Sequence, residues 1–287
     1  MLKEHHLKGA THWPEGYKMA VALTFDFQGG EDVRPLPDGR VNHEEFTQAE
    51  YGPKTGIWRI LRILEEQGVR ATFMTCGGIA ERYPEAVKAI VSKGHEVAGH
   101  GYHHEVARDL PREEERVIIQ RVTEIIQRIS GKRPMGWRSC TQSPNSLELL
   151  MEQGYLWNSN SFSYDLPFVW EGDDRKLVEL PRQPFGDGRT YGHRDSGNPQ
   201  TTLVVWKALF DELYKEANTT ATFCPFQFHP YVSSRPGRAS ALAGLIQHMR
   251  QHDGVWFATG SELARWCLKL SITEAVTGFP PDLAHAS

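Results

Sequence analysis

The clearest indication of the fold is Met19-Ala20-Val21-Ala22-Leu23-Thr24-Phe25-Asp26, near the start of the chain. The run before Asp26 is uncharged and contains β-branched and aromatic residues, as is typical of a strand buried on both faces. A polar connection from residue 28 to residue 53 follows, and a connection of that length is usually shaped or functional. The sequence therefore places Asp26 at the carboxyl end of a buried strand, where α/β enzymes carry their chemistry.

Outward from this stretch, short apolar runs alternate with segments of helical periodicity. Further strands are predicted at 69–74, 97–98, 135–138, 155–159, 177–180, 223–228 and 255–258. Helices are predicted at 57–66, 84–93, 111–129, 147–153, 204–216, 239–251 and 260–270. This alternation favours a mostly parallel sheet in an α/β barrel. Segments 161–174 and 185–199, which contain Gly and Asp, are expected to cross the mouth of the barrel.

The composition limits the class of protein. The 287 residues carry a net charge of -4 without a basic cluster, which argues against a nucleic-acid partner. The sequence has no run of the ~20 apolar residues that a membrane helix needs and no signal-peptide core, so a soluble, cytoplasmic protein is expected. The four cysteines are far apart and are expected to be reduced. We expect a single domain over 1–287, with its core at about 19–265 and a peripheral arm at 271–287.

His100 and His104 are the strongest candidates for metal ligands. They follow the predicted strand at 97–98, and residues four apart share one face if this segment forms a helical turn. Two imidazoles on one face can bind one ion, with zinc–nitrogen distances of about 2.0–2.1 Å. A solvated helix face is the alternative for such a pair.

Four motifs at strand ends occur in a characteristic order. They are Thr24-Phe25-Asp26, the His100/His104 pair, Gly136-Trp137-Arg138 and Phe228-His229-Pro230. This order resembles the polysaccharide deacetylase superfamily, the NodB-like carbohydrate esterase family 4. Within it, Glu50-Tyr51-Gly52, Ser143-Pro144-Asn145 and Asp165-Leu166-Pro167-Phe168 resemble the branch of allantoinase, cyclic imidase and Helicobacter-type peptidoglycan deacetylase. The resemblance implies an α/β fold, a distorted (β/α) barrel of about seven strands.

The resemblance also implies roles for individual residues. Asp26 matches the general base, Arg138 the residue that orients it, and His229 the general acid. His100 and His104 match two ligands of a divalent metal, of which zinc is the first expectation.

Gln28 is a departure from the family pattern, because it stands where this branch has a metal-binding Asp. Its neutral carbonyl is a weaker ligand than a carboxylate. One alternative is that Asp26, Glu31, Asp32 or Glu50 supplies the missing charge. The other is catalysis without metal, because the Gly29-Gly30-Glu31 element resembles one in ureide-hydrolysing relatives that work without metal.

Five residues are candidates for substrate binding: Gln28, Glu31, Trp137, Tyr164 and Asp165. Gln28 and Glu31 follow the catalytic Asp26, and Asp165 belongs to the branch-specific element. The aromatic residues could line a pocket, although Trp137 also suits the core.

The predicted function is hydrolysis of a non-peptide C–N bond in a small amide, imide or ureide. Deacetylation of an N-acetyl sugar or of peptidoglycan is the alternative within enzymes. A non-catalytic binding protein on the same fold is the alternative of another class, which Gln28 permits and the acid–base set disfavours. By resemblance alone, a homo-oligomer is expected, with a homotetramer as the specific prediction.

Overall fold

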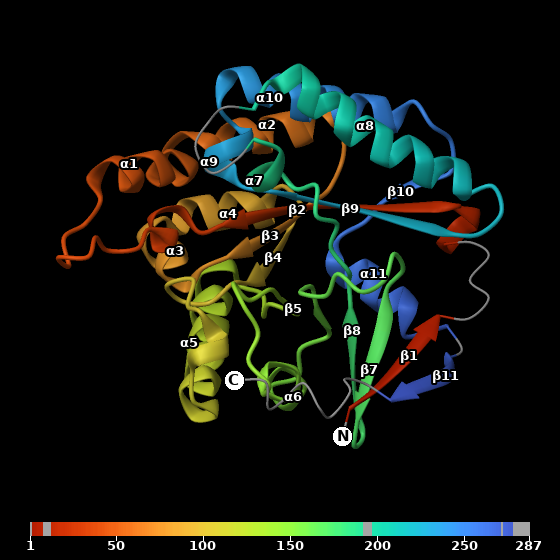
Figure 1. Cartoon of the computed structure of the whole chain (residues 1–287), viewed down its shortest axis with the longest axis horizontal. Helices are drawn as coiled ribbons and strands as arrows, with labels where there is room; N and C mark the ends of the chain where they lie inside the picture. The colour runs from red at the N-terminus through yellow and green to blue at the C-terminus, as the bar shows by residue number, and fades with distance from the viewer. Residues whose placement is uncertain (1, 8–12, 192–196, 271, 278–287) are drawn as a thin grey trace.

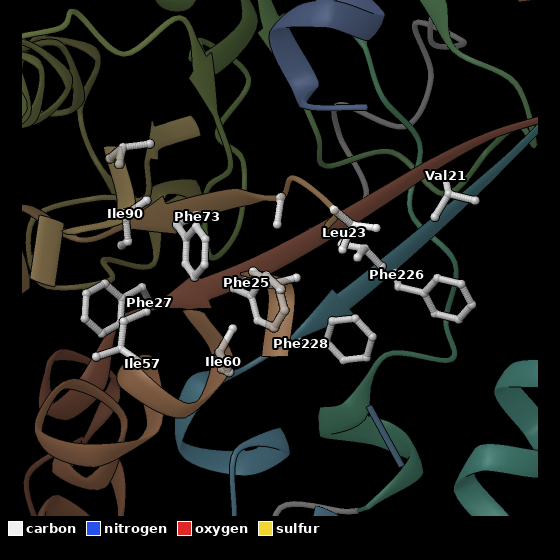
Figure 2. Close-up of a cluster of buried hydrophobic side chains, with 14 of the residues drawn as sticks. Val21, Leu23, Phe25, Phe27, Ile57, Ile60, Phe73, Ile90, Phe226 and Phe228 are labelled. Carbon is white, nitrogen blue, oxygen red and sulfur yellow. The ribbon is translucent and has the colours of Figure 1, made fainter. Parts of the chain in front are cut away.

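The central element of the fold is β2 (Met19–Phe27), whose residues are all buried. The structure is a computed structural model, and it describes residues 2–7, 13–191, 197–270 and 272–277. The larger side chains of β2 belong to one apolar cluster, whereas Ala20 and Ala22 belong to a second. Figure 2 shows Phe25 and Phe27 in the first cluster with Ile57 and Ile60 of α2 (Ile57–Gln67). Burial in both clusters explains why the strand carries no charge before Asp26.

Parallel strands form most of the sheet, as predicted. Their order is β10 (Val255–Phe257), β2, β3 (Thr72–Thr75), β4 (Glu96–Gly99), β5 (Gly136–Trp137), β6 (Trp157–Asn158) and β8 (Arg175–Glu179), and β9 (Thr222–Phe228) also pairs with β2. Phe25 lies opposite both Phe73 and Phe228. The residues that follow β2, β3 and β9 therefore emerge at the same edge of the sheet.

Helices cover the parallel strands. They are α1 (His43–Tyr51), α2 (Ile57–Gln67), α3 (Gly77–Arg82), α4 (Pro84–Ser92), α5 (Arg112–Ser130), α6 (Ser146–Glu152), α7 (Asp187–Thr190), α8 (Pro199–Glu216), α9 (Pro230–Ser233), α10 (Pro236–Arg250) and α11 (Gly260–Cys267). In Figure 1, α2, α10 and α8 lie along one side of the molecule, where α10 contacts both of the others. The helix α5 packs against α3, α4 and β4.

Local chemistry fixes where several helices start and stop. The helix α2 ends at Gly68, whose φ of 62° is a left-handed conformation that glycine adopts without a Cβ penalty. The helix α11 starts with a capping box between Thr259 and Glu262. In α1, the Asn42 side chain accepts a hydrogen bond from the Glu45 backbone N–H. The sequence did not predict α1, because most of its residues are exposed and give little apolar periodicity.

An antiparallel extension continues the sheet beyond β8. The strand β7 (Phe168–Gly172) pairs with β8 and with β1 (Lys3–Leu7), and β1 also pairs with β11 (Ile272–Thr277). The prediction that all of 161–174 crosses the barrel mouth is therefore wrong for β7. Its partner β1 is distant in sequence, and local pattern does not reveal such pairing. Part of the expected mouth segment 185–199 and of the arm 271–287 lies outside the described residues.

The four cysteines are free, as expected. None of the helices in the described ranges has the length and apolar character required to cross a membrane. The mixed α/β architecture with a mainly parallel sheet matches the predicted fold class.

Candidate active site

Several polar side chains meet where the parallel strands end. Asp26 is the penultimate residue of β2, His100 follows β4, Arg138 follows β5 and His229 follows β9. Asp26, His100 and Arg138 are almost completely buried, with 2%, 1% and 2% of their surface exposed. Burying these polar groups is costly unless each is paired, so their contacts define what the site can do.

Arg138 holds the carboxylate of Asp26. Its Nη1 donates to Asp26 Oδ1 at 2.6 Å, and its other donors reach Ser159 and Thr24. Burial opposes the charge on Asp26, but the Arg138 guanidinium together with His100 and His229 holds the pKa of this carboxyl well below its usual range. Asp26 is therefore ionised at neutral pH, in the form that a base or a ligand requires.

Gln227, which sequence reasoning missed, occupies the other oxygen of Asp26. Its Nε2 donates to Asp26 Oδ2 at 2.5 Å, and Gln227 itself lines the pocket described below. It lies two residues before His229 on β9, so the motif containing His229 could have drawn attention to it. Gln227 thus couples the buried carboxylate to the surface that a substrate would contact.

His100 is arranged as a neutral ligand. Its Nδ1 donates to the backbone carbonyl of Arg138 over 2.6 Å, and its Nε2 lies 3.1 Å from Gln28 Oε1. Burial lowers the pKa of His100 to about 3, so Nε2 carries a lone pair at neutral pH. The Gln28 amide donates to Asp32, which turns its oxygen toward His100. Two acceptor atoms therefore face each other, as they do when both bind one cation.

His104 approaches His100 without a helix. Its φ of 54° lies in the left-handed region, and β4 ends at Gly99 with a non-helical segment after it. The expectation of a helical turn is therefore wrong, yet the two imidazole centroids are 4.6 Å apart. The loop therefore brings the two imidazole rings close together, as the i, i+4 spacing predicted, but it does so without a helical turn.

An acidic partner of His104 is Asp32, one of the carboxylates considered from the sequence. His104 Nδ1 lies 2.7 Å from Asp32 Oδ1, as an ion pair without regular hydrogen-bond alignment. Burial disfavours the imidazolium, but the Asp32 carboxylate raises the pKa of His104 to about 9. The imidazole also contacts Cys140 and lowers the pKa of its thiol. The site thus contains a carboxylate as well as the neutral donors.

The donor set fits a divalent cation. It consists of two imidazoles, the Gln28 carbonyl and the Asp32 carboxylate, all of which are known ligand types, and His104 must release its proton to bind an ion. The unaligned Nδ1 of His104 and the facing lone pairs of His100 and Gln28 are the observations in favour. The other two carboxylates considered are engaged elsewhere: Glu31 with Arg82, and Glu50 with Arg82 and the Gly30 N–H.

Asp187 holds His229, and sequence reasoning missed this partner as well. His229 Nδ1 lies 2.6 Å from Asp187 Oδ1, and the His229 backbone N–H and Ser233 hydroxyl donate to Oδ2. Burial lowers the pKa of His229, but the Asp187 carboxylate outweighs it with help from Asp26, and the net shift is upward. His229 Nε2 is left facing Asp26 Oδ2 at 3.9 Å.

A pocket of about 490 Å³ opens over these residues. Asp26 and His100 lie beneath its lining, whereas His104 and His229 line it directly. Its other lining residues include Gln28, Asp32, Cys140, Phe162, Arg182, Arg189, Gln227, Tyr231, Arg235 and Arg238. This volume lies within the range of small-molecule sites, about 300–1,000 Å³.

The candidate substrate-binding residues divide between the pocket and other places. Gln28 lines the pocket, and Glu31 pairs with Arg82 and His103 outside the lining. Trp137 is buried in the core. Tyr164 donates to Glu4, and Asp165 accepts from Gln183.

The comparisons with known proteins agree with this architecture. Residues 48–152 match the family model described as Polysaccharide deacetylase. The chain is similar to the peptidoglycan deacetylase of Helicobacter pylori, with 27% identity over 87% of this chain and 93% of that protein.

Solved structures extend the likeness to nearly the whole chain. A Mycobacterium smegmatis protein, provisionally named a polysaccharide deacetylase, has 30% identity and a TM-score of 0.87, with 96% of this chain and 99% of that one covered. The allantoinase Puue has 25% identity and a TM-score of 0.83, with 91% and 95% covered. These findings confirm the NodB-like barrel fold. The chain belongs to the polysaccharide deacetylase family and is a hydrolase of the deacetylase and amidohydrolase type, which acts on carbon–nitrogen bonds other than peptide bonds.

Proposed function

We propose that this protein hydrolyses a C–N bond of a small amide, imide or ureide in the pocket beside His229. The observation that carries the proposal is the pairing of Asp26 with Arg138 and of His229 with Asp187, with Asp26 and His229 3.9 Å apart. Arg138 keeps Asp26 ionised, and Asp187 favours protonated His229. A base and an acid with opposite protonation states are what amide hydrolysis requires.

In the proposed reaction, Asp26 accepts a proton from water as the water oxygen bonds to the substrate carbonyl carbon. Arg138 orients the carboxylate and keeps it charged. His229 then donates its Nε2 proton to the leaving nitrogen as the C–N bond breaks. Because Gln227 covers one oxygen of Asp26, we propose that its amide shifts to admit the water.

We propose that His100, His104 and Gln28 hold a divalent metal, with zinc as the first choice, and that Asp32 compensates its charge. When bound, such an ion lowers the pKa of water and polarises a carbonyl. The residues contribute orientation: Arg138 fixes the ring of His100 through its backbone carbonyl, and Asp32 holds Gln28 and His104. This arrangement resembles the outer contacts that orient metal ligands in other proteins.

A glycan deacetylase is the second candidate, and the similarity to the Helicobacter pylori peptidoglycan deacetylase favours it. The pocket volume of about 490 Å³ and the similarity to an allantoinase support a small substrate instead. A non-catalytic binding protein is the third candidate, and the paired acid and base argue against it.

We further propose that residues 1–287 form one catalytic domain and that the protein is a homotetramer. Light scattering would test the homotetramer.

The test is turnover of purified full-length protein on cyclic imides, ureides, N-acyl amines and N-acetyl sugars, before and after chelation. Turnover of a small cyclic substrate that Asp26→Asn abolishes is expected. Exclusive activity on N-acetyl sugars would favour the second candidate. Binding without turnover of any member of the panel would favour the third. Activity that survives complete removal of metal would contradict the metal proposal alone.

A further inference from the structure

The pocket contains more positive than negative charge once its ion pairs are matched. Asp26 is paired with Arg138, Asp187 with His229, and Asp32 with His104. Arg182 and Arg189 also line the pocket, and neither forms a salt bridge with a carboxylate within the described residues. The site thus has a cationic side on which two arginines have no salt bridge among the described residues.

Arg182 is the more informative of the two because part of its guanidinium group is buried. Its Nε is shielded from solvent without a hydrogen-bond partner among the described residues, and its guanidinium lies 4.4 Å from the centre of the Phe162 ring. Burial and the charge of Arg138 lower the pKa of Arg182 to about 10, so it remains charged at neutral pH. A buried unpaired donor on a cation is costly, which favours a role in holding an anion.

Arg189 adds a second cation beside the proton donor. It lies on α7, the same short helix that begins with Asp187, the partner of His229. Both arginines line the same pocket, and the positive charge of Arg189 helps to lower the pKa of Arg182. A ligand carboxylate would offer acceptors to this side of the pocket.

We propose that the substrate carries a carboxylate or a comparable small anionic group, and that Arg182 binds this group with Arg189 while the C–N bond lies near His229. The proposal rests on the proposed function for the position of that bond. It narrows the substrate class from neutral amides and neutral N-acetyl sugars to anionic small molecules. Arg182 is then a residue that determines specificity.

Binding of succinate tests the proposal without requiring turnover. Isothermal titration of the full chain should detect succinate and much weaker binding of succinamide, its neutral analogue. Arg182→Gln should weaken succinate binding roughly 10- to 100-fold, the loss expected for hydrogen bonds to a charged group. Arg128→Gln, which changes an exposed α5 arginine paired with Glu81, is the control and should bind as the wild type does.

Succinate binding that is equal in wild type and Arg182→Gln, or absent from both, would overturn the anion site. Arg182→Lys keeps the charge and should retain part of the affinity, which excludes misfolding as the cause of the loss. Once a substrate is known, Arg182→Gln should raise KM for an anionic substrate more than it lowers kcat. An equal loss of kcat on neutral and anionic substrates would instead assign Arg182 to oxyanion stabilisation. Absence of hydrolysis with intact succinate binding would contradict the proposed function and leave the anion site standing.

A second cluster, between α8 and α10, carries an independent inference. Asp211 lies on α8, His248 on the last turn of α10 and His252 just beyond it. One ligand atom from each lies within 4.8 Å of the others, and His248 Nε2 is 2.6 Å from Asp211 Oδ1. His252 Nδ1 donates to the His248 backbone carbonyl at 2.9 Å, which leaves Nε2 as the available ligand.

Aromatic packing restricts these side chains. The His252 ring lies 5.0 Å from the Phe210 ring and 4.6 Å from the Tyr214 ring, and His248 lies 5.7 Å from Phe210. The two histidines and a carboxylate are a set that binds zinc with an open fourth position. Because the restricted rings need little reordering, the entropy cost of binding an ion is reduced.

We propose that Asp211, His248 and His252 bind a divalent transition metal such as zinc, separate from the pocket, and that it links α8 to α10. Zinc titration of chelator-treated full-length protein tests this with two variants. His252→Gln should lose one bound ion per chain and the associated rise in Tm while retaining the fold. His43→Gln, which changes an exposed histidine of α1 outside both proposed metal sites, should match the wild type. Equal zinc stoichiometry in His252→Gln and wild type would overturn the proposal.

Discussion

Two pairs of histidines, each four residues apart, occupy different kinds of surroundings in this protein. The rings of His100 and His104 lie 4.6 Å apart after a parallel strand, and those of His248 and His252 lie 4.9 Å apart at a helix end. The helical geometry expected for the first pair is found near the second. In the first pair, a left-handed residue in a loop brings the rings together.

Sequence spacing thus predicts that two side chains lie close together, but it does not predict whether they are buried or exposed. His100 is buried beside Asp26 and Arg138, whereas His248 pairs with Asp211, whose side chain is 52% exposed. Low solvent access strengthens electrostatic effects around the first pair, and water screens the second. The same residue change should therefore have different consequences in the two regions.

Matched Asp→Asn changes should give the largest difference. Asp26→Asn removes the proposed base and should lower kcat/KM by roughly 10²–10⁴-fold. Asp211→Asn makes the same chemical change outside the pocket and should leave kcat/KM within about twofold. Steady-state kinetics on the substrate found in the panel measures both. Similar losses of kcat/KM in the two variants would show that the two regions do not differ in their contribution to catalysis.

Measurements of stability should distinguish the buried Arg138–Asp26 ion pair from exposed ion pairs. Arg138→Met leaves Asp26 buried without its cation and should reduce the free energy of unfolding by about 3–5 kcal/mol. Arg112→Met removes exposed pairs with Glu148 and Glu152 and should cost about 1 kcal/mol or less. Urea unfolding measures both, and the double variant Asp26→Asn/Arg138→Met should recover part of the first loss. No recovery would mean that Arg138 acts mainly through its contacts with Ser159 and Thr24.

The pH dependence of activity should show how Asp187 affects the pKa of His229. Asp187, Asp26 and Asp32 raise the pKa of His229 against the effect of burial, and activity should fall as pH rises through that pKa. Asp187→Asn removes the nearest of these charges, so the alkaline limb of the kcat profile should move to lower pH. The acidic limb should move less. An unchanged alkaline limb would exclude His229 as the group responsible for it.

The smallest effect on stability should come from loss of the Asp211–His248 pair. Asp211→Asn in metal-free protein should change the free energy of unfolding by only about 0.2–1 kcal/mol, and added salt should reduce the difference. Urea unfolding at low and high salt measures this. A loss of several kcal/mol would mean that the cluster is as tightly coupled to the core as the Arg138–Asp26 pair.

Much of the fold follows from local pattern. The buried strand β2 and the amphipathic helices α2 and α5 are recognisable because their apolar residues recur with the period of the element. The antiparallel strands β1 and β7 are not, because each is stabilised by a partner far away in the chain.

The residues of the candidate active site also divide into those that the sequence identified and those that it did not. The motif order identified Asp26, His100, Arg138 and His229 as candidates, and the fold brings them together. Asp187 and Gln227 were missed, because their contacts join residues 42 and 201 positions apart. Gly186-Asp187-Gly188-Arg189 has the composition of a surface loop, and its packing against β9 and α9 buries Asp187 completely.

Local sequence is enough to recognise the buried strand, the alternating fold and the order of the motifs that mark the family, because these depend on residue type and spacing. The pairing of charges, in contrast, becomes evident only in the folded chain. Folding joined Asp187 to His229 and Asp32 to His104, and among the described residues it left Arg182 Nε without a hydrogen-bond partner. The reason is physical: the energy of a charge depends on burial and on neighbours a few ångströms away, which chain folding supplies.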